Sequence, residues 1–370
     1  VPFGKQKLEG FVIDIVDNID TDYDLKEIIE LIDLKPVLSS ELLKLGKWMQ
    51  AKTLCTLVNA YQTMLPNFMK AGNSHKTTNK KVSYIRFIND YNITSSKQKE
   101  LTELLKEKDM LKSELSKLSA SALKTLINHG NVEEYSVEVN RRVSNNIILD
   151  NKKELSLQQN DVFNKIKSNF KKFKPFLLHG VTGSGKTEVY LQLIDEVLNI
   201  NKEALVLVPE ISLTPQFISI FEGRFGSKVA VLHSGLSAGE KYDEWNRIEN
   251  GDAKIVIGAR SAVFAPLNNI GIIIVDEEHS TTYKQENHPR YNALDIALFR
   301  GKYHNAPVVM GSATPSLESY TRAQMGIYEL LEMNNRINNN LPSVYLVDMK
   351  DEIRTAHPVL SRLLIEKIED

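Results

Sequence analysis

The feature that most constrains the fold is a series of short runs, apolar throughout, that recur between residues 176 and 311. Stretches with helical patterns separate six such runs, at residues 176–179, 204–208, 228–233, 254–258, 270–275 and 307–311. Strands that are apolar throughout, instead of alternating, are typical of parallel strands covered by helices on both faces of the sheet. We therefore predict an α/β domain with a parallel sheet over residues 150–331.

The first of these runs leads directly into a glycine-rich loop and then into a helical pattern. Residues 180–187 read G-V-T-G-S-G-K-T, which matches G-x-x-x-x-G-K-[ST] in the strand–loop–helix context of a P-loop. Glycines let backbone N–H groups curl around phosphate oxygens, and the N-terminus of the following helix adds a favourable dipole. Lys186 is expected to reach the β- and γ-phosphates, and Thr187 to ligate Mg²⁺. The predicted nucleotide-binding residues here are Gly180, Thr182, Gly183, Ser184, Gly185, Lys186 and Thr187.

An acidic pair follows the apolar run at residues 270–275. A P-loop needs an acid at the end of a neighbouring strand to hold the metal and to prepare the attacking water. Asp276 is placed to contact Mg²⁺, directly or through water, and Glu277 to act as general base or to orient that water. We predict that Lys186, Asp276 and Glu277 are catalytic, that ATP and Mg²⁺ are the cofactors, and that Thr187 and Asp276 are the metal ligands.

Composition and charge narrow the class of protein. The chain of 370 residues is 42% hydrophobic and 25% charged, as in two or three soluble globular domains. It has no run of eighteen apolar residues and no start resembling a signal peptide, so we expect a cytoplasmic protein without a membrane partner. The single cysteine, Cys55, excludes an internal disulfide and a cysteine-cluster zinc site in this chain, and we expect it to be a small buried hydrophobe. The net charge of −1 does not by itself indicate a nucleic-acid partner.

The first 75 residues form a zone of their own. Residues 10–17 read as a strand and residues 40–49 as a helix with apolar leucines, while residues 71–79 read as a polar linker. The chain begins in what reads as the middle of a β-rich unit. We predict a partial β-rich domain over residues 1–75.

A second zone covers residues 82–143. A helical pattern over residues 119–130 precedes an alternating strand at residues 132–139. A helical cluster closed by a β-hairpin suggests a small helix-turn-helix or winged-helix module, and such modules also serve as protein-contact platforms. We predict a winged-helix-like domain over residues 82–143. Five lysines without an acid follow in residues 165–174, and they fit either a solvated helix face or a phosphate contact.

Several motifs resemble those of superfamily-2 helicases. D-E-E-H at residues 276–279 resembles the DEAD/DEAH box, and G-S-A-T at residues 311–314 resembles motif III, which couples nucleotide state to DNA. Residues 209–216 resemble motif Ia, and residues 155–159 resemble a Q-motif. The last resemblance implies that Gln159 reads adenine through the two-sided hydrogen bonding of an amide.

Other stretches resemble a narrower group, the replication-restart helicases of the PriA type. They are residues 180–190, 233–237, 258–266 and 283–291. The resemblance is dense from residue 150 to 330 and looser before it. It implies that the lobe from residue 150 is RecA-like helicase lobe 1, that residues 1–75 are part of the family's N-terminal DNA-binding domain, and that residues 82–143 are its winged helix.

This resemblance implies an ATP-dependent 3′→5′ DNA helicase that recognises stalled forks and D-loops and initiates primosome assembly for replication restart. The implied partners are forked and single-stranded DNA, single-strand-binding protein, and primosome and helicase-loading proteins. The residues implied in DNA binding or coupling are Arg260, Ser261, Tyr283, Lys284, Arg290, Tyr291, Ser312 and Thr314. From spacing alone, the two tyrosines beside Lys284 and Arg290 fit base stacking and core packing equally well, and His279 fits a structural hydrogen bond.

The family also carries a cysteine-rich zinc module and a second motor lobe beyond the region seen here, so residues 332–370 are expected to be a linker towards that lobe. A helicase completes its ATP site with an arginine from the second lobe. We therefore expect this chain by itself to bind nucleotide weakly and to hydrolyse it poorly, and zinc only in the parent protein. Two alternatives stay open: another superfamily-2 DNA translocase, such as a branch-migration or restriction motor, and a non-catalytic DNA-binding module switched by nucleotide.

Overall fold

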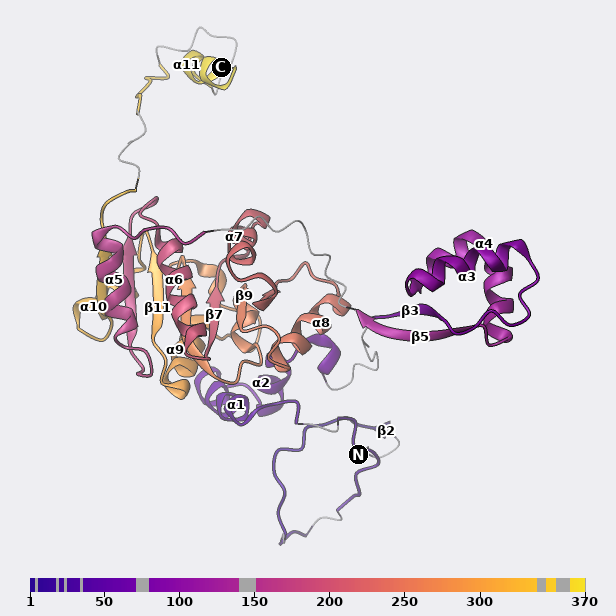
Figure 1. Cartoon of the computed structure of the whole chain (residues 1–370). Coiled ribbons are helices and arrows are strands. Elements are labelled where there is room, and N and C mark those ends of the chain that lie inside the picture. The colour runs from indigo at the N-terminus through magenta and orange to yellow at the C-terminus, as the bar shows by residue number, and fades with distance from the viewer. Residues whose placement is uncertain are drawn as a thin grey trace.

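The structure is a computed structural model of the chain (Figure 1). It describes residues 1–3, 6–17, 20–22, 25–33, 36–70, 80–139, 151–337, 344–350 and 360–369. The predicted linker at residues 71–79 lies outside the described residues, as do residues 140–143 of the second zone. Within the described ranges, no helix has both the length and the apolar character needed to cross a bilayer.

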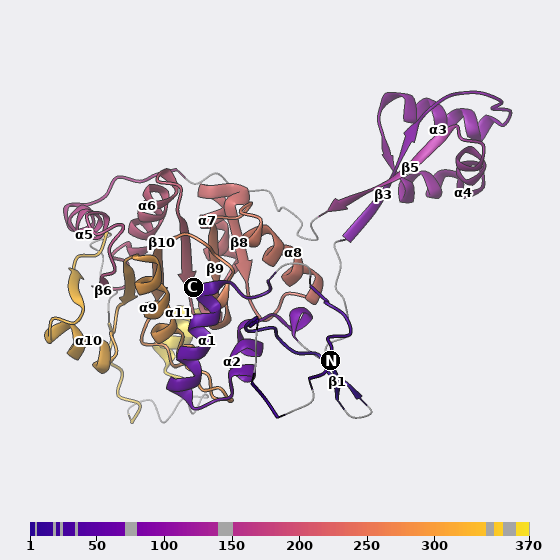
Figure 2. The same ribbon diagram turned by 90° about the horizontal axis from the view of Figure 1, so that it is seen from below.

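A seven-stranded sheet forms the centre of the largest unit (Figures 1 and 2). The strand order is β12-β6-β11-β10-β7-β9-β8, and every neighbouring pair is parallel. The strands are β6 (Pro175–Gly180), β7 (Glu203–Leu207), β8 (Val229–Leu232), β9 (Ile255–Gly258), β10 (Ile270–Asp276), β11 (Val308–Ser312) and β12 (Glu329–Met333). The six apolar runs are six of these strands, so the predicted parallel α/β fold is confirmed. The edge strand β12 carries two glutamates and was not predicted.

Helices cover both faces of this sheet and create two cores. The helices α5 (Leu157–Lys167), α6 (Lys186–Asn199) and α7 (Pro215–Phe225) pack on one face. The helices α8 (Ala238–Glu249), α9 (Ala293–His304) and α10 (Leu317–Gln324) pack on the other. Successive strand residues point to opposite faces, so Leu205 and Leu207 enter one core while Ala204 and Val206 enter the other. Because both faces of the sheet are covered, the six runs are apolar throughout instead of alternating.

The first zone adds two helices to this unit. The helix α1 (Ser40–Thr53) packs against α9, and α2 (Leu57–Met64) packs against α1; a short 3₁₀ turn, η1 (Asn67–Met69), follows. The side chain of Ser39 caps α1, and its buried stripe is Leu42, Leu45 and Met49. The predicted helix at residues 40–49 is confirmed and is four residues longer. Cys55 is buried, as expected.

The strand predicted at residues 10–17 is wrong, because those residues form no strand and are mostly exposed. Among the described residues of this zone, only the two-residue strands β1 (Pro2–Phe3) and β2 (Gln6–Lys7) pair with each other. A strand gains stability only when a neighbour satisfies its backbone groups and covers its apolar face. The run of β-branched apolar residues at 10–17 could not show that such a neighbour is missing here.

An ion cluster joins α1 to the sheet unit. Arg300 of α9 is 0% exposed, and its guanidinium donates to both carboxylate oxygens of Glu41 at 2.7 and 3.0 Å. Its remaining donors reach the carbonyls of Val263, Ala265 and Leu267 at 2.8, 2.9 and 3.3 Å. His304 Nε2 lies 3.0 Å from the second oxygen of Glu41. The buried charges of Arg300 and Glu41 therefore neutralise each other.

The cluster predicts an acid-sensitive interface. Burial alone would raise the pKa of Glu41, but Arg300 and His304 outweigh it and lower the pKa from 4.5 to about 2. Because the folded pKa is the lower one, the stabilisation is complete above about pH 5 and is lost as the pH falls towards 2. We expect this loss to be on the order of 3 kcal/mol in the free energy of unfolding.

Urea unfolding followed by tryptophan fluorescence between pH 7 and pH 2 measures this acid dependence. Glu41→Gln should remove it, whereas Glu249→Gln, at an exposed carboxylate on α8, should leave it unchanged. Equal acid dependence in the wild type and in Glu41→Gln would show that the cluster does not control stability in acid.

The second zone folds around its own small core. The strands β3 (Lys80–Phe87), β4 (Met110–Leu111) and β5 (Val132–Val139) form an antiparallel sheet in the order β4-β3-β5, and α3 (Ser96–Glu107) and α4 (Lys112–Asn128) pack on it. The predicted strand at residues 132–139 is confirmed. The predicted helix is part of α4, which bends at Ser119, where the Ser119 hydroxyl accepts from the N–H of Ala122. Figure 1 shows this unit beside the larger one; α11 (Arg362–Glu369) follows near the C-terminus.

Candidate nucleotide site

Three adjacent strands bring the predicted site together at one edge of the sheet. In β6, β11 and β10, the register pairs His179 with Ser312 and Gly311 with Asp276. The carboxyl ends of parallel strands meet at the same edge, where open α/β sheets bind their ligands. The phosphate loop, the acidic pair and the G-S-A-T segment therefore adjoin, although more than a hundred residues separate the phosphate loop from the G-S-A-T segment in sequence.

The phosphate loop depends on two glycines with positive φ. Gly183 has φ +80° and Gly185 has φ +82°, in the left-handed region that other residues rarely adopt. A Cβ on Gly185 would also lie 2.3 Å from Nε2 of Gln159 and 2.6 Å from Cδ1 of Ile337. This loop then opens α6, whose first residue is Lys186. The sequence forms this turn because only glycine meets both the conformational and the steric demand.

The polar groups of the loop fit a phosphate and a divalent metal. The Lys186 ammonium donates to the carbonyl of Gly180 at 2.7 Å, so it is folded over the loop at the start of α6. The Ser184 hydroxyl is buried and has no hydrogen-bond partner. Backbone N–H groups at a helix N-terminus and an ammonium are the donors that phosphate oxygens require. When nucleotide is bound, Lys186 and the loop would hold its phosphates, and Thr187 and Asp276 would hold Mg²⁺.

Gln159 has a different place from the predicted one. Its side chain is only 3% exposed. The carbonyl oxygen of its amide accepts from the N–H of Ser156 at 2.8 Å, and its NH₂ donates to the carbonyl of Ser184 at 3.0 Å. Both sides of the amide are thus engaged, so in this structure Gln159 holds the phosphate loop and presents no face to adenine. The resemblance implied contact with adenine for Gln159; its hydrogen bonds to the phosphate loop were not predicted and follow from tertiary packing.

Two buried tyrosines hold Asp276. The Tyr190 hydroxyl, from α6, donates to Oδ1 of Asp276 at 3.0 Å. The Tyr283 hydroxyl donates to the backbone carbonyls of Asp276 and Leu207 at 2.6 and 3.0 Å. Burial raises the pKa of Asp276, against the hydrogen bond from Tyr190, which lowers it. Burial also raises the pKa of both tyrosines, so their hydroxyls stay protonated and act as donors.

The residues after Asp276 connect this strand end to the next one. Glu277 has φ +48°, a left-handed conformation that is costly for a side chain with a Cβ and that turns the chain sharply. Nδ1 of His279 lies 3.5 Å from Glu277 and shares a 2.8 Å hydrogen bond with the hydroxyl of Ser312, which also accepts from the N–H of Thr314. His279 therefore has the structural hydrogen bond expected for it, and it links the acidic pair to the G-S-A-T segment.

Glu278 fixes the other side of this turn and was not predicted as a site residue. It is buried, and its carboxylate accepts from the N–H and hydroxyl of Ser316 at 2.7 and 3.0 Å and from the hydroxyl of Ser319 at 2.8 Å. Its own N–H donates to the carbonyl of Gly311 at 3.0 Å. The acidic turn is thus attached to the start of α10. The sequence signals were its place at the end of a buried strand, next to two other carboxylates, and its membership of the D-E-E-H segment.

The residues expected to bind or couple DNA divide into buried and exposed ones. Tyr283 and Tyr291 are 1% and 3% exposed, so in this structure they pack in the core and cannot stack on bases. This outcome decides between the two roles that their spacing left open. The side chains of Lys284 and Arg290 are exposed. The positive charges of Lys284 and Arg290 are therefore exposed to solvent, while the rings of Tyr283 and Tyr291 attach the loop to the core.

Arg260, in the 3₁₀ turn that follows β9, positions this loop. Its guanidinium donates to the carbonyls of Thr282 and Lys284 at 3.3 and 3.0 Å, and it lies over the ring of Tyr291. Ser261 and Thr314 are exposed, whereas Ser312 is fully buried and cannot touch DNA directly. The structure therefore places Arg260 where it orders the loop that also carries Tyr283.

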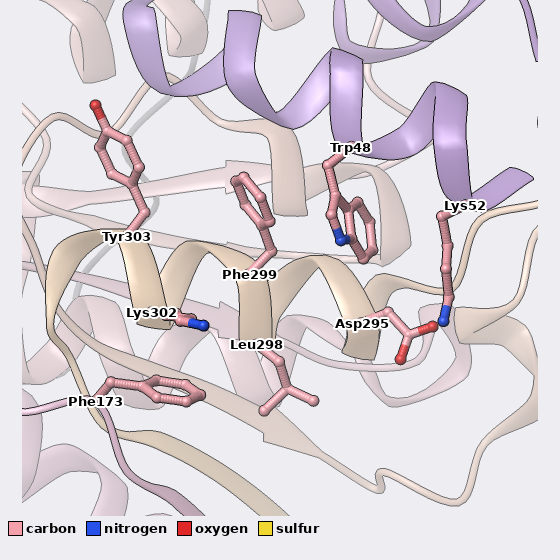
Figure 3. A pocket seen from close by; sticks show the side chains of 8 residues that line it. All are labelled: Trp48, Lys52, Phe173, Asp295, Leu298, Phe299, Lys302 and Tyr303. Carbon is pink, nitrogen blue, oxygen red and sulfur yellow. The ribbon is translucent and has the colours of Figure 1, made fainter.

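A groove among the described residues lies away from the predicted site. It has a volume of about 530 Å³ and is lined by side chains of α1 and α9 and by Phe173 (Figure 3). Its lining consists of Trp48, Lys52, Phe173, Asp295, Leu298, Phe299, Lys302 and Tyr303. None of these residues belongs to the predicted site, so hydrogen-bonding chemistry, and not cavity size, identifies the nucleotide site.

The lysines at residues 165–174 are mostly paired. Lys165, Lys167 and Lys174 form ion pairs with carboxylates. Since α5 ends at Lys167, the five lysines do not share one helix face. Three of them therefore have acidic partners close by in space, and all three partners lie outside residues 165–174.

Comparison with known proteins agrees with the chemistry of the site. A family model described as the 3′ DNA-binding domain (3′BD) matches residues 1–66, and one described as type III restriction enzyme, res subunit, matches residues 152–317. Replication restart protein PriA of Bacillus subtilis (strain 168) is 40% identical over 450 residues, which cover 100% of this chain and 56% of that protein. Over its whole length the chain is homologous to replication restart protein PriA.

A second relative also matches along the whole chain, and again the chain covers only about half of that protein. The PriA protein of Haemophilus influenzae is 36% identical over 386 residues, covering 100% of this chain and 52% of that protein. The chain thus spans about half the length of the curated PriA relatives it matches. Among solved structures, the Hef helicase domain of Pyrococcus furiosus is 21% identical, covers 48% of this chain and 37% of that chain, and has a TM-score of 0.36. The homology to PriA rests on the sequence relatives, and the site residues agree with it.

Proposed function

We propose that this chain is the nucleotide-binding and fork-binding part of an ATP-dependent 3′→5′ DNA helicase that recognises stalled forks and D-loops and initiates primosome assembly. The observation that supports it most is the contact between the P-loop helix and the acidic strand end, made by the hydrogen bond from Tyr190 to Asp276. Homology to PriA supports the restart role. ATP and Mg²⁺ are the cofactors we propose.

The site residues divide the chemistry of ATP hydrolysis among them. Lys186 and the phosphate loop bind and orient the phosphates, and Asp276 with Thr187 holds the metal, which neutralises developing charge when bound. Glu277 orients the attacking water or accepts its proton. The left-handed backbone of Glu277 and the link through His279 to Ser312 tie its position to the G-S-A-T segment. Movement of that segment would change hydrolysis.

DNA contact is proposed for three regions. The match of residues 1–66 to the 3′ DNA-binding domain supports DNA binding by the first zone, and the helices and antiparallel sheet of residues 80–139 support a winged helix. In the sheet unit, Lys284 and Arg290 present exposed charge for phosphates. Single-strand-binding protein, primosome proteins and helicase-loading proteins are the proposed protein partners, and the zinc module is proposed for the parent protein.

The choice of DNA substrate tests this function. The intact protein should bind a fork with a free leading-strand 3′ end at least about tenfold more tightly than plain duplex of equal length, or about 1.4 kcal/mol. Fluorescence anisotropy at one fixed salt concentration measures the ratio, because phosphate contacts make affinity depend on salt. Equal affinity for both DNAs would contradict fork recognition and favour a branch-migration or restriction motor.

A further inference from the structure

Tyr190 and Gly311 form a buried pair beside the proposed metal ligand. Tyr190 is 0% exposed and lies in α6, three residues after Thr187, so both side chains stand on the same face of the helix that the phosphate loop opens. Its hydroxyl donates to Oδ1 of Asp276 at 3.0 Å. One helix thus carries a proposed metal ligand and a donor that reaches the other ligand.

Gly311 provides the space for this contact. A Cβ at position 311 would lie 1.8 Å from the Tyr190 hydroxyl, 3.1 Å from its ring carbon Cζ and 3.2 Å from Oδ1 of Asp276. The first distance is impossible, and the other two are tight but close to ordinary contact. Gly311 is paired with Asp276 in the sheet register and is not in a left-handed conformation, so the requirement for glycine here is steric.

We propose that Tyr190 is a positioning residue for the metal, because its hydroxyl fixes the carboxylate of Asp276 for Mg²⁺. Position 311 is glycine because the Tyr190 hydroxyl occupies the space that a side chain there would fill. This inference rests on the proposed ATPase function. A carboxylate held at one oxygen cannot rotate freely, so the direction of its other oxygen is set before the metal arrives. The hydroxyl of Tyr283 on the backbone carbonyl of Asp276 fixes the same residue from its main chain.

The test is metal-dependent nucleotide binding by Tyr190→Phe in the intact protein. A fluorescent ADP analogue measures nucleotide affinity without metal, in EDTA, and electron paramagnetic resonance of Mn²⁺ with ADP measures the affinity for metal. We expect nucleotide affinity in EDTA to be unchanged and metal affinity to fall by about tenfold to a hundredfold. Tyr61→Phe is the matched control, since it removes another buried tyrosine hydroxyl remote from the site, and should change neither value.

A second variant separates the steric role from the hydrogen bond. Gly311→Ala should weaken metal binding and lower thermal stability, because the new methyl group displaces the Tyr190 hydroxyl. Tyr190→Phe combined with Gly311→Ala should recover stability relative to Gly311→Ala alone, since the clashing oxygen is gone, but should not recover metal affinity. If Gly311→Ala does not fold, recovery of folding in the double variant answers the steric question, and Tyr190→Phe alone decides the role in metal binding.

The outcomes distinguish this inference from the function on which it rests. A wild-type protein that binds no nucleotide would overturn the proposed ATPase function and this inference with it. A wild-type protein that binds nucleotide and metal, with unchanged metal affinity in Tyr190→Phe, would overturn the inference alone. Full metal affinity in Gly311→Ala would also contradict it.

Discussion

Lys186→Ala is expected to reduce DNA-stimulated ATP hydrolysis by the intact protein by at least about a hundredfold to a thousandfold, the usual effect of losing one donor to developing charge. Lys186 begins α6, and its ammonium lies 2.7 Å from the Gly180 carbonyl, over the loop that is proposed to hold the phosphates. DNA binding should stay close to wild type, because Lys186 is not among the residues proposed to contact DNA. A coupled ATPase assay and an electrophoretic DNA-binding assay measure the two properties.

Lys172→Ala is the matched control for the loss of a lysine from the same lobe. Lys172 is exposed and lies outside the site, so its removal should leave ATP hydrolysis within about twofold of wild type, in line with the small effect of surface substitutions. Hydrolysis by Lys186→Ala within tenfold of wild type would show that the phosphate cradle is assigned to the wrong residues.

Arg300→Met is expected to lower the free energy of unfolding by about 3–5 kcal/mol, the cost of breaking a buried ion pair. The change leaves the Glu41 carboxylate without its bidentate partner, and the carbonyls of Val263, Ala265 and Leu267 lose their donors. Glu41 also holds α1 against α9, so the first zone should loosen from the sheet unit. Urea unfolding at pH 7, followed by the fluorescence of Trp48 at this interface, measures the loss.

Two further variants test whether the uncompensated charge is the cause. Adding Glu41→Leu to Arg300→Met should recover part of the lost stability, because no buried charge then remains unpaired. Lys302→Met, at an exposed lysine on the same helix, should change stability by less than about 0.5 kcal/mol. A loss below 1 kcal/mol in Arg300→Met would mean that the cluster does not hold the interface.

The local sequence pattern predicted the strands of the sheet unit correctly, apart from β12, but predicted a strand in the first zone that does not form. The six apolar runs became six strands because strands covered on both faces need apolar side chains at every position. Residues 10–17 are rich in β-branched apolar residues too, but no strand forms there, since strand formation depends on a neighbour that local pattern does not encode. The edge strand β12 was missed for the opposite reason, because its neighbour β6 stabilises a segment with a weak pattern.

The hydrogen-bond partners of buried side chains could not be predicted from local sequence either. Arg300 lies in an otherwise ordinary helical stretch, and nothing nearby in sequence shows that Glu41, 259 positions away, neutralises it. Tyr190 had a signal, its spacing of three from Thr187, but its partner Asp276 is 86 residues further on. Gln159 and the two tyrosines of the loop at residues 281–291 were found by resemblance, while burial decided which of their possible hydrogen bonds and contacts they make.

The sequence by itself determined the parallel α/β fold, the phosphate loop and the acidic strand end, because strand burial, glycine conformation and phosphate chemistry each depend on neighbours in the chain. Only the tertiary structure decided how these parts meet. It placed β11 between β6 and β10, set Tyr190 against Asp276, left room for that contact at Gly311, and buried Glu41 with Arg300. These contacts join residues far apart in sequence, and their geometry is fixed by packing across the whole sheet, which local pattern does not contain.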